Sequence, residues 1–325
     1  AYDLKAELPE KIDTKPSARK WIEACVGAKF KVDNIDVKPA TRKPAPPFTT
    51  STIQQEASRK LGSNVKRTMS DAQKLYESGY ISYMRTDSTS LSETAQQAIL
   101  AQITKEFGDK YAQPRQYASK SANAQEAHEA IRPSYPENPT ITDGDRDMER
   151  LYDLIWKRAV ASQMADAKLE RTQVSISVSA HPGEFLMAKG EVIKFDGFLK
   201  LYIENLDDEP EEEGSAILPP LKEGQPLDLN QMTGTERYTK PPARYTEAGL
   251  VKKLEELGIG RPSTYAPTIS KIMEEDRGYV IRENRPGVER AYAVITLSGK
   301  EVKEVAKTEI TGAISNRLVP TDMGL

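Results

Sequence analysis

The chain has 325 residues, of which 38% are hydrophobic and 29% charged, and its formal net charge is −3. This length allows two or three domains with their own cores. No apolar run approaches the roughly 20 residues that a membrane helix needs, no signal segment opens the chain, and a single Cys25 fits a reducing cytosol, so we expect a cytoplasmic protein without a membrane partner.

The first quarter of the chain changes from strands to helices. We expect strands at 30–32 and 35–37, a boundary at the prolines of 39–47, and helices at 50–61 and 68–78. Gly62-Ser63-Asn64 separates the two helices, and Gly79 ends the second. The composition of Tyr80–Met84 then predicts a strand.

The middle of the chain returns to strands. Ser90-Leu91-Ser92-Glu93 is a capping box that predicts a helix to about Phe107, before Gly108. A second helix is expected at 147–163. From Arg171 apolar residues alternate, and strand-like runs follow at 191–195, 199–203 and 227–229. Strands on both sides of the helices indicate that a helical part is inserted into a β domain.

The last part of the chain repeats the earlier order. We expect a helix at 247–257, a break at Gly258 and Gly260, and a second helix at 264–275 with Ser263 as its N-cap. Gly278-Tyr279-Val280 echoes Gly79-Tyr80-Ile81, and a strand at 291–297 is predicted to pair with 279–282 as a wing. Helix, turn, helix and wing is an arrangement that docks DNA, although winged helices also serve as protein contacts.

Charge is unevenly distributed along the chain. Residues 38–74 carry eight basic and two acidic side chains, a net charge of +6, whereas residues 204–213 carry seven acidic side chains and no base. The basic stretch suits phosphate binding but also fits a solvated helix face. The acidic run predicts a solvated loop that DNA would avoid.

Tyr83 and Arg85 carry the clearest chemical signal. On a strand, residues i and i+2 share a face. A phenol has a pKa of about 10 and is a poor nucleophile near neutral pH, but a fixed cation beside it stabilises charge on the phenolate and on a phosphate. The alternative interpretation is an ordinary strand end with a surface ion pair.

Four motifs in order resemble those of type IA DNA topoisomerases. They are Phe48-Thr49-Thr50-Ser51-Thr52-Ile53-Gln54-Gln55, Gly79-Tyr80-Ile81-Ser82-Tyr83-Met84-Arg85-Thr86-Asp87-Ser88, Gln125-Glu126-Ala127-His128-Glu129-Ala130-Ile131-Arg132-Pro133, and Lys240-Pro241-Pro242-Ala243-Arg244-Tyr245-Thr246-Glu247-Ala248 continuing to Gly258-Ile259-Gly260-Arg261-Pro262-Ser263-Thr264-Tyr265. The resemblance covers nearly the whole chain. Met84 between the tyrosine and the arginine is typical of bacterial topoisomerase I, whereas the topoisomerase III branch more often has proline.

The resemblance implies an α+β multidomain fold. A β arch (gate or hinge) domain, residues 1–43 and 172–243, would carry an inserted helical, winged-helix-like domain with the active-site tyrosine, residues 44–171. Residues 244–325 would form part of a second winged-helix-like helical domain that binds DNA. Together these parts would gate a DNA-sized hole.

The resemblance also assigns roles to individual residues. Tyr83 would attack single-stranded DNA and form a 5′-phosphotyrosine, so that strand passage relaxes negative supercoils without ATP. Arg85 and His128 complete the expected catalytic set. The expected DNA-binding residues are Gln73, Arg132, Arg261, Ser263 and Thr264. Tyr80 is a rival nucleophile, but the opposite strand face gives it a packing role.

No metal residue is predicted in this chain. Asp143, Asp145, Asp147 and Glu149 lack the glycine and the final acid of a calcium loop, so they predict an acidic helix N-terminus. The family's Mg²⁺ site belongs to a Toprim domain, which we do not find before Tyr83. We therefore expect a fragment that does not relax DNA alone and whose partners are single-stranded DNA and that Toprim domain.

Two other functions stay open from the sequence. One is a non-catalytic winged-helix DNA-binding module, in which Tyr83 would have no role. The other is a tyrosine recombinase, but those enzymes use a set rich in arginine and histidine, and this chain has only two histidines.

Overall fold

A four-stranded antiparallel sheet forms one side of the computed structural model, which describes residues 3–117, 129–203, 218–274 and 278–325. Its strands are β1 (Phe30–Arg42), β2 (Ala167–Val178), β3 (Phe185–Phe195) and β4 (Pro226–Leu227), in the order β3-β2-β1-β4. β1 and β2 pair from Phe30 opposite Val178 to Arg42 opposite Ala167. The strands predicted at 30–32 and 35–37, from Arg171 and at 191–195 are confirmed, and they are partners in one sheet.

The end of the chain builds two smaller sheets. β5 (Met232–Thr235), β7 (Val288–Ser298) and β8 (Glu301–Thr311) form one, in that order, while β6 (Val280–Arg285) pairs with β9 (Ile314–Pro320). Gly299, with a φ of 60°, makes the tight turn between β7 and β8. Helix α1 (Lys15–Ala24), which the sequence did not lead us to expect, packs against β5 and β7.

Among the described residues, six further α-helices gather at the other end of the molecule. They are α2 (Thr50–Leu61), α3 (Val65–Glu77), α4 (Glu93–Phe107), α5 (Arg146–Ser162), α6 (Glu247–Glu256) and α7 (Tyr265–Ile272). Thr49, Asn64, Ser92 and Asp145 cap the first four of these with side-chain oxygens that accept backbone N–H groups. The helix predicted at 50–61 is confirmed, as is the one at 147–163 to within a residue at each end. A helix ends at Phe107 as predicted, but the capping box of Ser90 and Glu93 does not form, because Ser92 is the N-cap and Glu93 the first helical residue.

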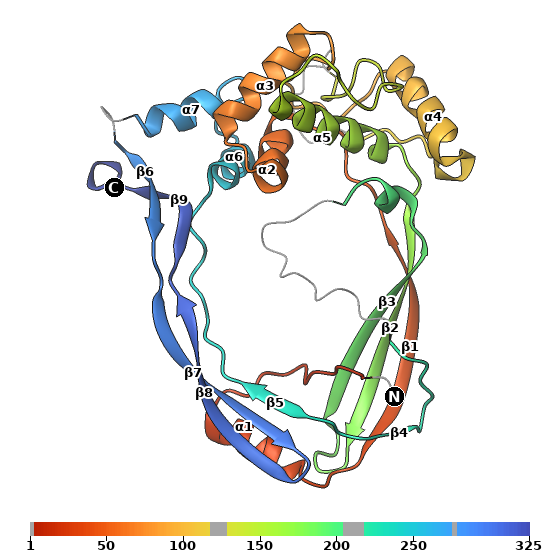
Figure 1. Cartoon of the computed structure of the whole chain (residues 1–325), viewed down its shortest axis with the longest axis vertical. Coiled ribbons are helices and arrows are strands. Elements are labelled where there is room, and N and C mark those ends of the chain that lie inside the picture. The colour runs from red at the N-terminus through yellow and green to blue at the C-terminus, as the bar shows by residue number, and fades with distance from the viewer. Residues whose placement is uncertain (1–2, 118–128, 204–217, 275–277) are drawn as a thin grey trace.

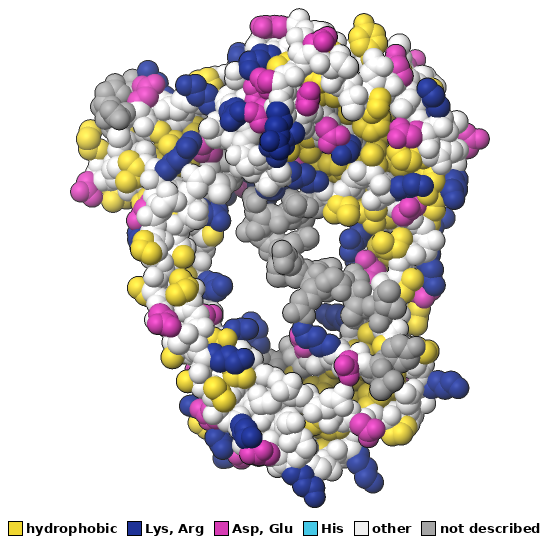
Figure 2. Space-filling model, in the orientation of Figure 1, with side chains coloured by type: hydrophobic (Ala, Val, Ile, Leu, Met, Phe, Trp, Pro, Cys, Tyr) yellow, Lys and Arg dark blue, Asp and Glu magenta, His cyan; other side chains and the backbone are white. Residues whose placement is uncertain are grey.

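The elements form a ring (Figure 1). The sheet of β1–β4 is one side, the strands β5–β9 are the base and the other side, and helices α2–α5 close the end opposite α1. The chain passes directly from β1 into α2 and from α5 into β2, but on the other side the ring is closed by contacts of α6 with α2 and of α7 with α3. Figure 2 shows an opening through the ring, with Lys and Arg side chains around its rim.

Each part of the ring has its own core. The helical core buries large side chains such as Phe48, Leu75, Met84 and Ile155. A second core holds the base, where α1 meets the sheet of β1–β4 and the sheet of β5, β7 and β8. Its residues include Ile22, Cys25, Val32, Ile176 and Leu297. A third, small core of Val65, Val251, Tyr265 and Ile269 lies where α3 meets α6 and α7.

Two strand predictions near the tyrosines were wrong. Tyr80–Met84 forms no strand and keeps only an isolated bridge between Ile81 and Pro133. Its backbone bonds go to separate partners, namely Leu75, Arg132, Ser134 and the Thr50 hydroxyl, rather than to one neighbouring strand. The predicted wing does not form either. Residues 291–297 lie in β7 and pair with β5 and β8, because the turn at Gly299 offers a local hairpin, and residues 280–282 of β6 pair with β9.

Three smaller predictions also need correction. Thr264, not Ser263, is the residue that precedes α7. Leu199 lies in a short 3₁₀ turn (Gly197–Lys200) rather than in a strand. The α-helices described in 244–325 are α6 and α7, and the described remainder is mostly β6–β9, so the description of this range as a helical domain fits only its first part.

Candidate active site

The segment with Tyr83 and Arg85 is a loop fixed by its buried residues. Met84 is 1% exposed and Thr86 3%, whereas Tyr83 is 42% exposed and Arg85 is also exposed. Buried residues therefore alternate with exposed ones although no strand forms. The tyrosine and the arginine both reach solvent on either side of the Met84 anchor.

The first turn of α2 holds one side of this loop. The Thr50 hydroxyl donates to the carbonyl oxygens of Met84 (2.8 Å) and Thr86 (3.1 Å) and lies 2.8 Å from the Thr86 nitrogen, which donates to it. The Thr50 backbone N–H also donates to the Thr86 oxygen, over 2.9 Å. Thr50 is fully buried, so these bonds are shielded from water. Sequence reasoning did not assign Thr50 a role, although it lies inside the first quoted motif.

Residues 130–134 hold the other side. The Ser82 hydroxyl donates to the Ala130 oxygen over 2.8 Å and accepts from the Arg132 nitrogen over 2.9 Å, while the Ser82 nitrogen donates to the Arg132 oxygen over 2.9 Å. The Ser134 nitrogen donates to the Tyr80 oxygen over 2.9 Å. Three of the four sequence motifs therefore meet around Tyr83.

The two tyrosines of the motif lie in different surroundings. The ring of Tyr83 meets that of Tyr76, on the last turn of α3, edge to face at 5.3 Å. The ring of Tyr80 packs against the helical core beside Tyr152, and its hydroxyl donates to Asp143 over 3.4 Å. Burial, and then the charge of Asp143, raise the pKa of Tyr80. The phenolate of Tyr80 is therefore harder to form than that of an ordinary tyrosine.

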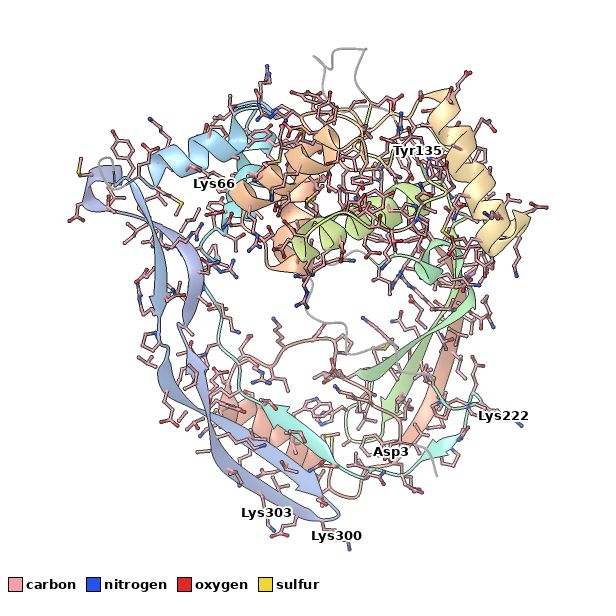
Figure 3. All side chains as sticks on the ribbon, turned by 45° about the horizontal axis from the view of Figure 1, so that its top comes forward. Asp3, Lys66, Tyr135, Lys222, Lys300 and Lys303 are labelled. Carbon is pink, nitrogen blue, oxygen red and sulfur yellow. The ribbon has the colours of Figure 1, made fainter. Side chains whose placement is uncertain are left out.

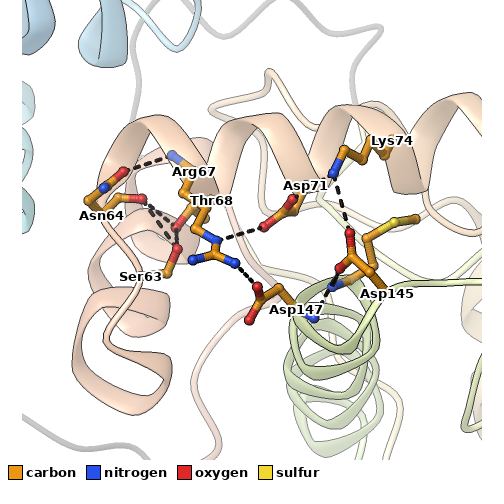
Figure 4. Close-up of polar contacts among 9 residues, drawn as sticks. Ser63, Asn64, Arg67, Thr68, Asp71, Lys74, Asp145 and Asp147 are labelled. Atoms are coloured by element: carbon orange, nitrogen blue, oxygen red, sulfur yellow. Dashed lines mark hydrogen bonds and ion pairs between the residues drawn. The ribbon is translucent and has the colours of Figure 1, made fainter.

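Ion pairs between α3 and α5 fix the helix that leads to Tyr83 (Figure 4). Arg67 pairs with Asp147, and Lys74 lies 3.4 Å from Asp145 and 3.3 Å from Asp71. Asp145 also accepts from the Asp147 and Met148 nitrogens at the start of α5. Two of the acids considered as a metal cluster are thus occupied as a helix cap and as partners of α3.

Arg132 lies beside the Tyr83 loop but is paired. Its guanidinium donates to Glu129 over 2.5 Å and to the Pro133 oxygen over 3.2 Å. Burial alone would raise the pKa of Glu129, but hydrogen bonds from Arg132 and Ser92 outweigh it, so that pKa is lowered. His128 lies outside the described residues.

The other predicted DNA-binding residues lie on α3 and just before α7. Gln73 on α3 donates to Glu77 over 2.6 Å. Arg261, Ser263 and Thr264 are all exposed before α7, where the Thr264 hydroxyl accepts from the Arg261 nitrogen over 2.8 Å. Burial, and then the charges of Glu255 and Asp87, raise the pKa of Tyr265 at the start of α7, while the charge of Arg261 lowers it.

The described residues contain no group of three or more His, Cys, Asp or Glu side chains that could hold a metal ion. The side chains of this part of the chain therefore do not fit the magnesium ion that the resemblance implies. Among the same residues, no helix is long and apolar enough to cross a membrane.

Comparison with known proteins agrees with the motifs. A family model described as DNA topoisomerase matches residues 2–322. The chain is 48% identical to DNA topoisomerase 1 of Streptomyces coelicolor over 313 residues, which are 93% of this chain and 33% of that protein. It is 40% identical to the prokaryotic-type DNA topoisomerase 1 of Acanthamoeba polyphaga mimivirus, over 94% of this chain and 38% of that protein.

A solved structure is also similar. Full-length topoisomerase I from Thermotoga maritima superposes with a TM-score of 0.67 at 35% identity, over 86% of this chain and 46% of that one. The chain thus spans about a third of the length of the two sequence relatives above.

Proposed function

Because the chain belongs to the prokaryotic DNA topoisomerase I family, we propose that it supplies the nucleophile and the strand gate of a type IA DNA topoisomerase. The single observation that carries the proposal is the exposed phenol of Tyr83 in a loop that two other motifs hold from both sides. Such a loop presents an oxygen to a substrate without itself moving.

In the proposed reaction the Tyr83 oxygen attacks a phosphodiester of single-stranded DNA. A bond forms between this oxygen and phosphorus, the bond from phosphorus to the 3′ oxygen breaks, and the phenol proton leaves while the 3′ oxygen gains one. The products are a 5′-phosphotyrosine and a free 3′-OH. Attack by that 3′-OH reverses the step, so resealing needs no ATP. Arg85 stabilises the negative charge on the phosphate and the phenolate.

We infer that the ring opens where α6 and α7 contact α2 and α3, because only non-covalent contacts close it there. There the Ser51 hydroxyl donates to Glu255 over 2.6 Å, and Glu247 accepts from the Val65 nitrogen over 3.2 Å and pairs with Arg282. The small third core lies beside these bonds. Breaking a few polar contacts and a small apolar patch costs far less than unfolding a domain, so this seam suits a gate for a passing strand.

The proposal includes a partner domain. A Toprim domain would supply Mg²⁺, which neutralises phosphate charge and aligns the 3′-OH. The proposed units of this chain are the arch (1–43 and 172–243), the tyrosine unit (44–171) and the unit from 244 onward, to which β6–β9 add strands. With magnesium, this chain alone should not relax a supercoiled plasmid, whereas the chain joined to a Toprim domain should. Relaxation by the chain alone would contradict this division of labour.

The polarity of the covalent link tests the chemistry directly. An oligonucleotide is labelled at its 3′ end or at its 5′ end, incubated with the chain joined to a Toprim domain, and denatured. A 5′-phosphotyrosine leaves the 3′ label on the protein and releases the 5′ label. Mass spectrometry should place the adduct on the peptide that contains Tyr83. Protein that retains the 5′ label, or an adduct on another peptide, would overturn the proposal.

A further inference from the structure

The segment Arg237–Tyr245, called the strap here, connects β5 to α6. It contains three cationic side chains, two tyrosines and no acid. All nine of its residues are exposed, with Tyr238 at 42% and Tyr245 at 47%. Residues 240–245 of the strap belong to the fourth sequence motif, and the proposed chemistry gives these residues no role.

Backbone hydrogen bonds fix the strap at its two ends. Before it, the Glu236 nitrogen donates to the Ala293 oxygen of β7 over 2.9 Å, and at its end the Tyr245 oxygen accepts from the Leu318 nitrogen of β9 over 2.8 Å. Within the described part of the chain, the backbone of 238–243 makes no hydrogen bond, and Pro241-Pro242 favours an extended path. The segment is thus stretched along the ring without belonging to a sheet.

The cations of the strap are not used for ion pairs. Arg237, Lys240 and Arg244 make no salt bridge to a carboxylate of the described residues, and Arg237 instead lies 5.5 Å from the Tyr292 ring. Glu309 has a lowered pKa, first because Arg290 donates to it and less because of the charges of Arg237 and Lys240. Since Arg290 already pairs with Glu309, the positive charge of the strap remains available to an anion.

The position of the strap indicates which anion. It runs along the inner side of the ring, between the β6–β9 pair and the opening (Figure 1), and leads straight into α6, which contacts α2 beside the Tyr83 loop. Alternating cations and exposed tyrosines are the composition that binds single-stranded nucleic acid, with phosphates on the cations and bases on the rings. One face of Tyr238 already carries the Arg290 guanidinium, 4.0 Å from the ring centre.

We propose that the strap is a binding track for single-stranded DNA inside the ring. Arg237, Lys240 and Arg244 bind successive phosphates, and Tyr238 and Tyr245 stack bases. The track continues toward the Tyr83 loop and guides the strand that Tyr83 cleaves or the strand that passes. This inference rests on the proposed function for the identity of its ligand.

The test compares two triple variants of the chain. One replaces Arg237, Lys240 and Arg244 with Ala. The control replaces Lys222, Lys300 and Lys303 with Ala, which removes the same charge from positions away from the opening (Figure 3). Fluorescence anisotropy with a labelled oligo-dT measures the dissociation constant over a series of salt concentrations. Three lost phosphate contacts should reduce the slope of log K against log salt by about 2, and the control should keep the slope of the unmodified chain.

Variants of the two tyrosines test whether the strap prefers single-stranded DNA to duplex DNA. Tyr238→Ala or Tyr245→Ala should weaken oligo-dT binding by about tenfold and leave duplex binding unchanged. Equal salt slopes for the two triple variants would overturn the track. If the tyrosine variants lose equal affinity for single-stranded and duplex DNA, the strap does not select single strands. If the unmodified chain does not bind DNA at low salt, the proposed function itself is contradicted.

Cross-linking keeps the inference testable if the triple variant unfolds. Lys240→Cys and Lys303→Cys each add one exposed thiol, while native Cys25 is 1% exposed and burial raises its pKa to about 11. An oligo-dT that carries a thiol-reactive group should couple faster to the Lys240→Cys chain than to the Lys303→Cys chain, and unlabelled oligo-dT should compete. Equal coupling rates would contradict the track.

Discussion

Two stretches of this chain have the same order of helix, glycine turn, helix and Gly-Tyr, yet they fold into different surroundings. In the first, α2 buries seven residues, including Thr50, Ser51, Gln54 and Glu56. In the second, α6 buries only Ala248 and Val251. The first unit is therefore part of a core, whereas the second is a partly exposed pair of helices at the seam of the ring.

The chain also continues differently after each Gly-Tyr. Behind Gly79, whose φ is 78°, it enters a loop that the Thr50 and Ser82 hydroxyls and the backbone of 130–134 hold by hydrogen bonds. Behind Gly278, the chain continues as β6, and Tyr279 is 40% exposed. The repeated local sequence pattern therefore determines the helices and turns, but residues far away in sequence determine whether a loop or a strand follows. The two units can be told apart by substitutions at matched positions.

The largest difference is expected at Tyr83. Tyr83→Phe removes only the attacking oxygen, so the chain joined to a Toprim domain should form no covalent DNA adduct. The matched change in the second unit, Tyr279→Phe, should leave adduct formation at its normal level. Denaturing gels with end-labelled DNA measure both. An adduct that survives in the Tyr83→Phe enzyme would place the nucleophile elsewhere, with Tyr80 as the first alternative.

A smaller loss is expected for Arg85→Lys. The charge is kept, but an ammonium cannot bind phosphate through a two-pronged planar group. The cleavage rate should fall by roughly a hundredfold, the lower end of the loss that removal of one aligned stabilising donor causes. Single-turnover cleavage of a short oligonucleotide gives the rate. Equal rates for the two enzymes would mean that Arg85 contributes charge without geometry.

Thr50→Val should act through stability. The change keeps the shape but removes the hydroxyl that bonds to Met84 and Thr86 in a fully buried site. The Thr86 oxygen keeps its bond from the Thr50 backbone N–H, but the Met84 oxygen and the Thr86 N–H lose the hydroxyl partner. Leaving such buried groups unpaired costs about 1–3 kcal/mol, which urea unfolding should detect. The control is Thr268→Val on α7, where the side chain is exposed, so its effect should stay within about 0.5 kcal/mol. Equal effects would show that the Tyr83 loop is not specially held.

The sequence predicted the helix boundaries better than it predicted the shape of the Tyr83 loop. Caps such as Thr49 and Ser92, and helix-ending glycines, set most helix boundaries locally, and the motifs identified Tyr83 and Arg85. The shape of the Tyr83 loop could not be predicted, because it depends on Thr50 and on residues 130–134, which are far away in sequence. Two missed elements did have local signals: the N-cap Thr14 with Pro16 in the first turn of α1, and the Gly299 turn between β7 and β8.

The smallest effect is expected at the rival tyrosine. Tyr80→Phe removes one hydrogen bond of 3.4 Å to Asp143 and keeps the ring beside Tyr152. Folding raises the pKa of Tyr80, so the neutral phenol is favoured in the folded chain. Any stability that this gives is present below the unfolded pKa of about 10 and is lost as the pH rises through the higher folded value. At neutral pH the Tyr80→Phe enzyme should therefore form the adduct at its normal rate, and its unfolding midpoint should match that of Tyr279→Phe. A lost adduct in this variant alone would transfer the role of nucleophile from the exposed tyrosine to the packed one, and the distinction drawn between the two tyrosines of the motif would fail.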